Sequence, residues 1–262
     1  MRRLLPACAA LIALAAGLSL GARLLRSDEP RVMLAGYATP LTGRTVTQRY
    51  NARLSAQALD GAVIPAGGVF SYNQTVKPWT VDQGYLKAPV SYDGEIVRAY
   101  GGGVCQTSTT LYNAALLAGL DVLERHPHVY APRYVPPGRD AAVAQYTVDL
   151  RIRNPYPWPL RIAARTTGER VEIRIYGAAR LGEGIEIVTE VLAATPPARV
   201  TRVLQDASGE IGSGRSAGAT GYRVVTSRVF SRMGQEVRRE RLSDDSYPAA
   251  DRVIALIEDS RP

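Results

Sequence analysis

The spacing of apolar residues predicts two helices in the first half of the chain. Between residues 49 and 62 apolar side chains recur every three or four positions and Asp60-Gly61 follows them, so we expect an amphipathic helix that ends at the glycine. A second run, residues 101–120, opens with three glycines and continues with helical apolar spacing. This run predicts a helix that is entered from a glycine loop, capped by threonine or serine, and ended at Gly119.

From residue 148 onward, apolar positions alternate with polar ones. The alternating segments are 148–152, 160–164 and 171–175, and a proline-containing turn at 154–157 separates the first two. Alternation with a period of two is typical of strands that bury one face, so the three segments predict an antiparallel sheet. Asp93-Gly94 lies between two further apolar stretches and predicts a hairpin.

Together these patterns predict an α+β fold. We expect the helix that carries Cys105 to pack on an antiparallel sheet, and a small β-rich unit to follow, because residues 182–258 again show short strand-like segments. The chain then divides into a signal peptide or N-terminal membrane anchor at 1–26, a polar tether at 27–44, a main domain at 45–178 and the β-rich unit at 179–262.

The N-terminus has the pattern of an export signal. Arg2 and Arg3 precede an apolar run over residues 4–22, which is also long enough to span a bilayer. Ser19 and Gly21 would permit cleavage, whereas the basic residues after them are typical of the flank of an uncleaved anchor. In either case we expect the rest of the chain to lie outside the cytoplasmic membrane, attached through this segment or released. A buried N-terminal helix of a cytosolic protein is the alternative.

The net charge changes this picture little. The chain has 32 basic and 24 acidic side chains, and four of the basic ones lie in residues 1–26 without any acid. Half of the formal excess of +8 therefore belongs to the N-terminal segment. The remainder is small and dispersed, so we expect no nucleic-acid partner.

Cysteine and histidine are scarce, which narrows the candidate chemistry. Two cysteines in 262 residues exclude a disulfide scaffold, and Cys8 lies in the N-terminal segment, which leaves Cys105 alone. Both histidines, His126 and His128, follow it within 23 residues. A lone cysteine in an exported protein is either a reactive thiol or a small buried apolar residue.

Cys105 lies where the glycine loop enters the predicted helix. Free N–H groups and the helix dipole at such a position lower the pKa of a thiol and bind an oxyanion. Cys105, His128 and Asp140 then follow the chain order of papain-like and transglutaminase-like enzymes, in which an imidazole activates the thiol and a carboxylate orients the imidazole. The supporting candidates are three glycines that permit close approach of a ligand, Gln106 as an oxyanion donor, and their neighbours: Gly101, Gly102, Gly103, Gln106, Thr107, Ser108 and His126.

The same residues also have a purely structural interpretation. Cys105 would then be a packing residue, the 126–128 segment a turn that caps the sheet, and Asp140 a residue that satisfies a tight loop. A zinc site built from the cysteine, the histidines and Asp140 is a further alternative, although histidines two positions apart around a proline are a poor chelating pair on a helix. We predict neither a metal nor a cofactor.

Several motifs resemble the VanW family of envelope proteins, first noted beside glycopeptide-resistance genes. The resemblance covers residues 45–178, and the family's proline-glycine turn is interrupted here as Pro65-Ala66-Gly67. The motifs that carry it are Asp60-Gly61, Phe70-Ser71-Tyr72-Asn73, Gly84-Tyr85, the run 101–114, the segment 124–128 and Gly138-Arg139-Asp140-Ala141. The tail resembles the glycine-five module over Gly218, Gly221-Tyr222-Arg223 and Gly234.

The resemblance implies a location and a partner but no reaction. It implies action at the cell wall, with peptidoglycan or its stem peptides as the partner, while the tail implies contact with wall sugars. One hypothesis is therefore a cysteine-dependent enzyme that transfers acyl groups or hydrolyses peptides. The other is a non-catalytic module that binds the cell wall or a partner through the glycine loop.

Overall fold

The computed structural model describes residues 31–92, 95–204 and 216–257. The expected signal or anchor at 1–26 lies outside these ranges. Up to residue 124 the elements are β1 (Val32–Pro40), α2 (Val46–Leu59), β2 (Val63–Ile64), β3 (Val69–Ser71), α3 (Tyr72–Val76), the 3-10 helix η1 (Val81–Gln83), β4 (Lys87–Tyr92), β5 (Glu95–Tyr100), α4 (Val104–Leu117) and β6 (Asp121–Glu124). They are followed by β7 (Arg151–Arg153), β8 (Leu160–Thr166), β9 (Arg170–Gly177), β10 (Gly184–Thr195), β11 (Arg199–Leu204), β12 (Ser216–Ala219), β13 (Gly221–Arg232), β14 (Gln235–Tyr247) and β15 (Ala250–Ile257).

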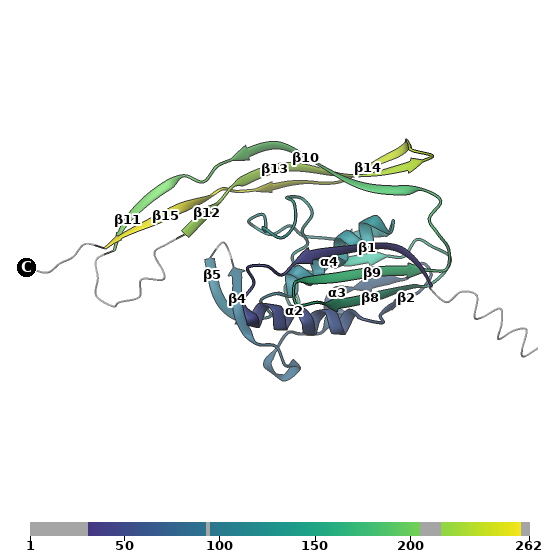
Figure 1. Cartoon of the computed structure of the whole chain (residues 1–262), viewed down its shortest axis with the longest axis horizontal. Coiled ribbons are helices and arrows are strands. Elements are labelled where there is room, and N and C mark those ends of the chain that lie inside the picture. The colour runs from purple at the N-terminus through teal and green to yellow at the C-terminus, as the bar shows by residue number, and fades with distance from the viewer. Residues whose placement is uncertain (1–30, 93–94, 205–215, 258–262) are drawn as a thin grey trace, which may run out of the picture.

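A four-stranded antiparallel sheet with the order β1-β9-β8-β2 forms the centre of the body. Helices α2 and α4 contact each other and the same sheet, α2 across β8 and α4 across β1 and β9 (Figure 1). Strands dominate the described residues, mostly in antiparallel sheets, and the helices cover one of them, which agrees with the α+β prediction.

The alternation of apolar and polar residues along β8 and β9 explains why one face of this sheet is buried and apolar. Leu160 and Ile162 of β8 and Ile173 of β9 are fully buried and belong to the main core cluster. Side chains between them point the other way, where Glu172 accepts from the exposed Arg165 at 2.7 Å. The helices therefore pack on the apolar face, while the opposite face is covered by ion pairs.

The predicted tether at 27–44 is wrong as far as the structure describes it. Strand β1 pairs with β9 along its whole length, and Thr39 is buried beneath α4. The strand escaped prediction because a bulge between Met33 and Ala35 breaks the period of two, and because its apolar side chains are only partly buried. This segment is thus part of the central sheet.

Helix α2 confirms the predicted helix with a shift of its start. It begins at Val46, because Thr45 and Gln48 form a capping box in which each side chain binds the other residue's backbone N–H. It ends before Gly61, whose φ of 82° suits glycine.

Two smaller sheets flank the body. Strands β4 and β5 pair antiparallel and confirm the predicted hairpin, whose residues 93–94 lie outside the described ranges. Of the three alternating segments expected in one sheet, only β8 and β9 share it. Strand β7 pairs instead with β3 and β6. The Asn154 side chain, which donates to the Ile64, Pro65 and Trp158 carbonyls, fixes the turn that redirects the chain.

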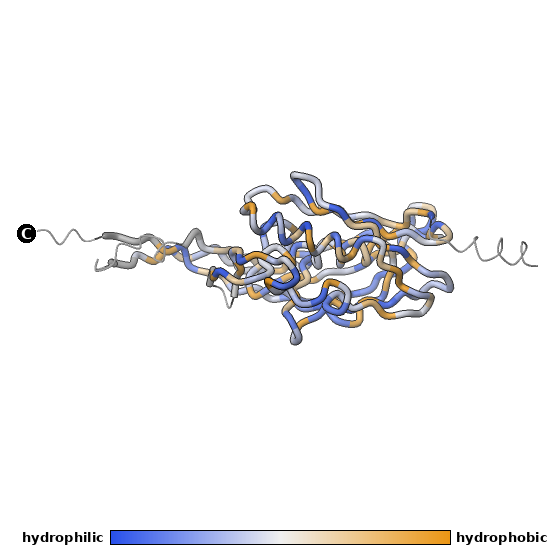
Figure 2. The backbone as a smooth tube through the Cα atoms, turned by 90° about the horizontal axis from the view of Figure 1, so that it is seen from below, coloured by the Kyte–Doolittle hydropathy of each residue, from blue (hydrophilic) through white to orange (hydrophobic). Residues whose placement is uncertain are grey.

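The C-terminal strands form a long ribbon that we call the C-terminal ribbon: the sheet β10-β13-β14, followed by the sheet β11-β15-β12. It arches over the body (Figure 1), and its distal part extends beyond the body as a narrow projection (Figure 2). β10 is exposed from Glu190 to Thr195. No helix among the described residues is long and apolar enough to cross a membrane.

Candidate functional site

The glycine loop before α4 sets the position of Cys105. Gly101 and Gly103 have φ values of 85° and 112°, which other residues rarely adopt. Gly103 is the N-cap, without any side-chain cap, so the expected threonine or serine cap is wrong. The turn delivers Cys105 to the first turn of α4.

The three glycines are required mainly by protein packing. A Cβ at Gly101 would lie 2.1 Å from the Trp79 ring, one at Gly102 would lie 2.6 Å from the Pro89 carbonyl oxygen, and one at Gly103 would lie 2.2 Å from the Gln48 carbonyl oxygen. The loop lines a cavity, but the space that each glycine leaves free is occupied by neighbouring residues of the protein and not by a ligand.

Cys105 and His128 lie next to each other in the wall of one cavity. The thiol is partly exposed and donates to the Val143 carbonyl at 3.3 Å, and it lies close enough to the His128 imidazole for that side chain to lower the pKa of the thiol. His128 arrives from the segment that follows β6, and its side chain is 21% exposed. Cys105 also packs against the main core cluster, so the interpretation of Cys105 as a packing residue stands beside the catalytic one.

Asp140 holds His128 in a single orientation. One carboxylate oxygen, Oδ2, accepts from the His128 backbone N–H at 2.7 Å and lies 2.6 Å from ring nitrogen Nδ1. Because Nδ1 is taken by Asp140, Nε2 is the ring nitrogen left for the thiol. The chain thus brings Cys105, His128 and Asp140 together in the order thiol, imidazole, carboxylate.

The other carboxylate oxygen of Asp140 is held by residues that sequence reasoning missed. Oδ1 accepts from Tyr247 Oη at 2.5 Å and from Arg125 Nη2 at 3.1 Å, and Asp140 itself is fully buried. Arg125 also donates to both oxygens of Asp245, at 2.6 and 2.7 Å. Tyr247 and Asp245 lie on β14, more than a hundred residues from Asp140, so no local pattern announces them.

These contacts set the charge states of the three groups. Burial alone would raise the pKa of the Cys105 thiol, but the hydrogen bond and charge of His128 outweigh it and lower that pKa below its ordinary value. Burial opposes charging of His128, yet its bonds to Asp140 and Cys105 raise its pKa to about 10. Burial also works against the Asp140 carboxylate, and the His128 hydrogen bond overcomes it to lower the pKa of Asp140. Both shifts favour the thiolate–imidazolium form of the pair over its neutral form.

A cavity of about 600 Å³ opens onto this group. The glycine loop, the start of α4 and the segment 128–134 form its walls, together with the loop between β1 and α2. Cys105 and His128 both line it, as does Arg44. A peptide-sized ligand would thus have access to the thiol.

The predicted supporting residues have other roles. Gln106 uses both N–H bonds of its amide, to Thr39 Oγ1 at 3.1 Å and to the Pro40 carbonyl at 2.7 Å, so none is left for an oxyanion. Thr107 donates to the Ala52 carbonyl, and Ser108 to the Ala141 carbonyl, so both fix helix packing.

His126 is separate from the group. Its Nε2 lies 3.2 Å from Glu124 on the exposed side of the segment. Within the described ranges, no group of three or more His, Cys, Asp or Glu side chains is arranged to hold a metal ion, which leaves the zinc alternative without a site there.

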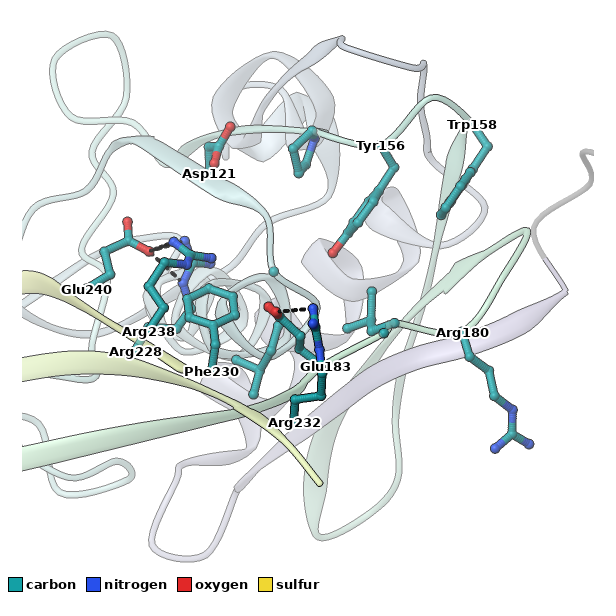
Figure 3. A pocket seen from close by; sticks show the side chains of 15 residues that line it. Asp121, Tyr156, Trp158, Arg180, Glu183, Arg228, Phe230, Arg232, Arg238 and Glu240 are labelled. Carbon is teal, nitrogen blue, oxygen red and sulfur yellow. Dashed lines mark hydrogen bonds and ion pairs between the residues drawn. The ribbon is translucent and has the colours of Figure 1, made fainter. Parts of the chain in front are cut away.

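A second cavity, of about 450 Å³, lies between the body and the C-terminal ribbon. Figure 3 shows the stacked Tyr156 and Trp158 on one side and arginines of β13 and β14 on the other. Its charges pair with one another, Arg228 with Glu240 at 2.8 Å and Arg232 with Glu183 at 3.0 Å. This cavity therefore joins two parts of the protein and presents little unpaired charge to a ligand.

Comparison with known proteins places the matched region around the Cys105 group. The family model described as "VanW like protein" matches residues 47–176. YoaR of Bacillus subtilis (strain 168) is 39% identical over 145 residues, which are 55% of this chain and 48% of the relative. The vancomycin B-type resistance protein VanW of Enterococcus faecalis (strain ATCC 700802 / V583) is 30% identical over 110 residues, 40% of each chain. The matches thus span less than half the length of these relatives, and no solved structure matches the chain.

Proposed function

We propose that this protein is a cysteine-dependent acyl-transfer or peptide-hydrolysing enzyme of the cell envelope. The chain belongs to the VanW family through residues 47–176. Cys105 and His128 line an open cavity, and Asp140 holds His128 from behind. The substrates of the proposed enzyme are the stem peptides of peptidoglycan. The observation that carries the proposal is that the thiol and an imidazole oriented by a buried carboxylate line the same cavity, close enough for the imidazole to lower the pKa of the thiol.

The proposed reaction begins with attack of the Cys105 thiolate on a peptide carbonyl carbon. The new S–C bond converts the carbonyl oxygen to an oxyanion. His128, as imidazolium, then donates its proton to the departing amine, the C–N bond breaks, and a thioester remains on Cys105. Water or a second amine attacks the thioester, His128 accepts the proton of the attacking group, and the thiolate leaves with its electron pair.

The oxyanion has a donor in the start of α4. The Val104 N–H donates to the Gly101 carbonyl at 2.9 Å, and the Gln106 N–H to the Gly103 carbonyl at 3.2 Å. Between them, the Cys105 N–H has no acceptor among the residues that the structure describes. This N–H and the positive end of the helix dipole would stabilise the oxyanion, the role first expected of Gln106.

The sequence of residues 1–26 favours an envelope location, which is consistent with this choice of substrate. The basic and apolar pattern of residues 1–26 favours export, either with cleavage or as a membrane anchor. One relative carries vancomycin resistance in its name, a property connected with the cell wall. We accordingly propose that the described part of the chain works outside the cytoplasmic membrane, attached through its N-terminal segment or released.

The test is digestion of purified peptidoglycan by the full chain, followed by chromatography of the released muropeptides. We expect wild-type protein to alter the muropeptide profile, and the Cys105→Ala variant, which removes the nucleophile, to leave it unchanged. Identical profiles with both proteins would overturn the enzymatic proposal. Co-sedimentation of both proteins with the peptidoglycan in that case would support the alternative of a non-catalytic wall-binding module.

A further inference from the structure

Arg44 lies in the wall of the Cys105 cavity in an unusual arrangement. Its Nε donates to Gln106 Oε1 at 2.9 Å, and its guanidinium carbon lies 4.8 Å from the centroid of the Tyr134 ring. Gln106 is the residue after Cys105, and Tyr134 Oη donates to the Cys105 carbonyl at 3.4 Å. Both groups that hold Arg44 are therefore direct neighbours of the nucleophile.

The two terminal nitrogens of Arg44 are left without a carboxylate. Only Nε is used within the described residues, and no Asp or Glu there pairs with this guanidinium. By contrast, Arg125 and Arg228 each have a carboxylate partner. An arginine that is held by its Nε and by stacking on a ring keeps its two terminal nitrogens, Nη1 and Nη2, in a fixed orientation. This arrangement suits bidentate binding of a carboxylate.

The charge of the cavity favours the same ligand. The residues that line it include Arg44, Arg133 and His128, and none of them is an aspartate or glutamate. Gln106, which orients Arg44, is itself fixed by Thr39 and Pro40, so the guanidinium does not depend on a mobile partner. A preorganised cation in a cavity without acids attracts an anionic group of the ligand.

We infer that the substrate carries a carboxylate close to the bond that is broken, and that Arg44 binds this carboxylate. The inference rests on the proposed function and specifies its substrate class as peptides with a free carboxylate near the reacting carbonyl. A stem peptide offers two sources of this chemistry, its C-terminal carboxylate and an internal one.

The direct test compares two alkylating reagents that differ in charge, iodoacetate and iodoacetamide. Both react with the same thiolate, so the ratio of their rate constants at Cys105 cancels the thiolate fraction and reports attraction of a carboxylate. We expect Arg44→Gln to lower the iodoacetate-to-iodoacetamide ratio by about five- to tenfold, and Arg44→Lys to lower it less. The measurement uses the full chain with Cys8→Ser and mass spectrometry of the Cys105 peptide.

Arg133→Gln is the matched control, because it removes the same charge from the same cavity. Arg133 is exposed, and within the described residues its side chain donates to the Gly218 carbonyl at 3.3 Å. We expect this variant to change the ratio by less than about twofold, since an exposed charge is screened. Equal losses in the two variants, or no loss in Arg44→Gln, would overturn the assignment while leaving the nucleophile in place. A Cys105 that reacts with neither reagent would overturn the proposed function as well.

Protection experiments identify the source of the carboxylate. A synthetic stem tetrapeptide should slow alkylation of Cys105 by iodoacetamide in wild type and less so in Arg44→Gln. Loss of protection on amidation of the C-terminus assigns the contact to the C-terminal carboxylate, and loss on amidation of the internal carboxylate assigns it there. Protection that survives both amidations contradicts the inference.

Discussion

His128 is the residue on which the proposed chemistry depends. Asp140 binds both its backbone and its ring, and the ring reaches the Cys105 thiol. The scarcity of cysteine and histidine in the sequence was enough to single out Cys105 and the two histidines, and the chain order of papain-like and transglutaminase-like enzymes added Asp140. It gave no indication of Arg44 or Arg125, since arginines are common in this chain and their roles arise only from contacts made in three dimensions.

Asp140→Asn tests the orienting role of the carboxylate. Oδ1 and Oδ2 each accept from two donors, so an amide NH₂ in either position would face N–H or O–H groups. We expect peptide cleavage to fall about 10³-fold, because the imidazole loses both its orientation and its countercharge. The measurement is the turnover of a peptidoglycan peptide by variant and wild type. Activity within a few-fold of wild type would exclude Asp140 from the site.

Gly103→Ala tests the loop that positions the nucleophile. A Cβ there would lie 2.2 Å from the Gln48 carbonyl oxygen, and the φ of 112° disfavours any side chain. We expect a loss of unfolding free energy of about 2–4 kcal/mol, measured by urea denaturation. The control is Gly168→Ala, where a Cβ meets no atom within 4 Å, and which should change stability by less than about 1 kcal/mol.

Among the elements, α4 is fixed at both ends by different parts of the chain. Its start is set by the glycine loop. At its end the buried Arg228 of β13 donates to the Leu120 carbonyl at 2.7 Å and to the Leu116 carbonyl at 3.4 Å. A cation at the carboxyl end of a helix also complements its dipole. The position of the nucleophile thus depends partly on the C-terminal ribbon.

Arg228→Leu tests this anchor. The change leaves the two carbonyls without this donor and Glu240 with only its longer contact to Arg238, at 3.8 Å, so we expect a loss of about 2–4 kcal/mol in unfolding free energy. Arg232→Leu on the same strand is the control, because Arg232 is 64% exposed and pairs with Glu183 at the surface. It should cost less than about 1 kcal/mol. Equal effects of the two substitutions in urea denaturation would contradict the anchoring role.

Some helices and strands of this fold were predictable from local sequence patterns, and others were not. Helices α2 and α4 and the β4–β5 hairpin were predictable because helical apolar spacing, glycine stops and turn residues are local signals, whereas the caps of both helices were not predicted correctly. β1 was not predictable, since its bulge and half-buried side chains hide the alternation. The partnership of β7 with β3 and β6 depends on the Asn154 turn and on long-range pairing, which alternation alone does not specify.

On the scale of the whole molecule, the C-terminal ribbon supplies part of the candidate site. The family match ends at residue 176, yet Tyr247 of β14 binds Asp140, and Asp245 binds Arg125. The Tyr247 hydroxyl also accepts from the Gly138 N–H at 3.0 Å. The ribbon therefore does more than extend the molecule: it holds the carboxylate behind His128.

Tyr247→Phe removes this link with little change of volume. We expect peptide cleavage to fall about tenfold, because Asp140 loses a hydrogen bond to its charged form and with it part of its orientation. Tyr222→Phe is the control, since Tyr222 pairs with Tyr247 in the same sheet and makes no hydrogen bond to the site. Equal activity in the two variants would show that the ribbon has no part in the chemistry.

The most direct test of the central claim is the pH dependence of Cys105 alkylation by iodoacetamide in the full chain. The ordinary pKa of a cysteine thiol is about 8.5. An activated thiol reacts at lower pH than this, because the His128 imidazolium, with its pKa of about 10, stabilises the thiolate. The account predicts that the alkylation rate in wild type rises with pH at values below the ordinary thiol pKa. In His128→Asn the same profile should move to higher pH, because the thiolate loses the hydrogen bond and the positive charge of His128 while burial still raises the pKa of the thiol. Superimposable profiles of the two proteins, both rising only around the ordinary pKa, would contradict the account.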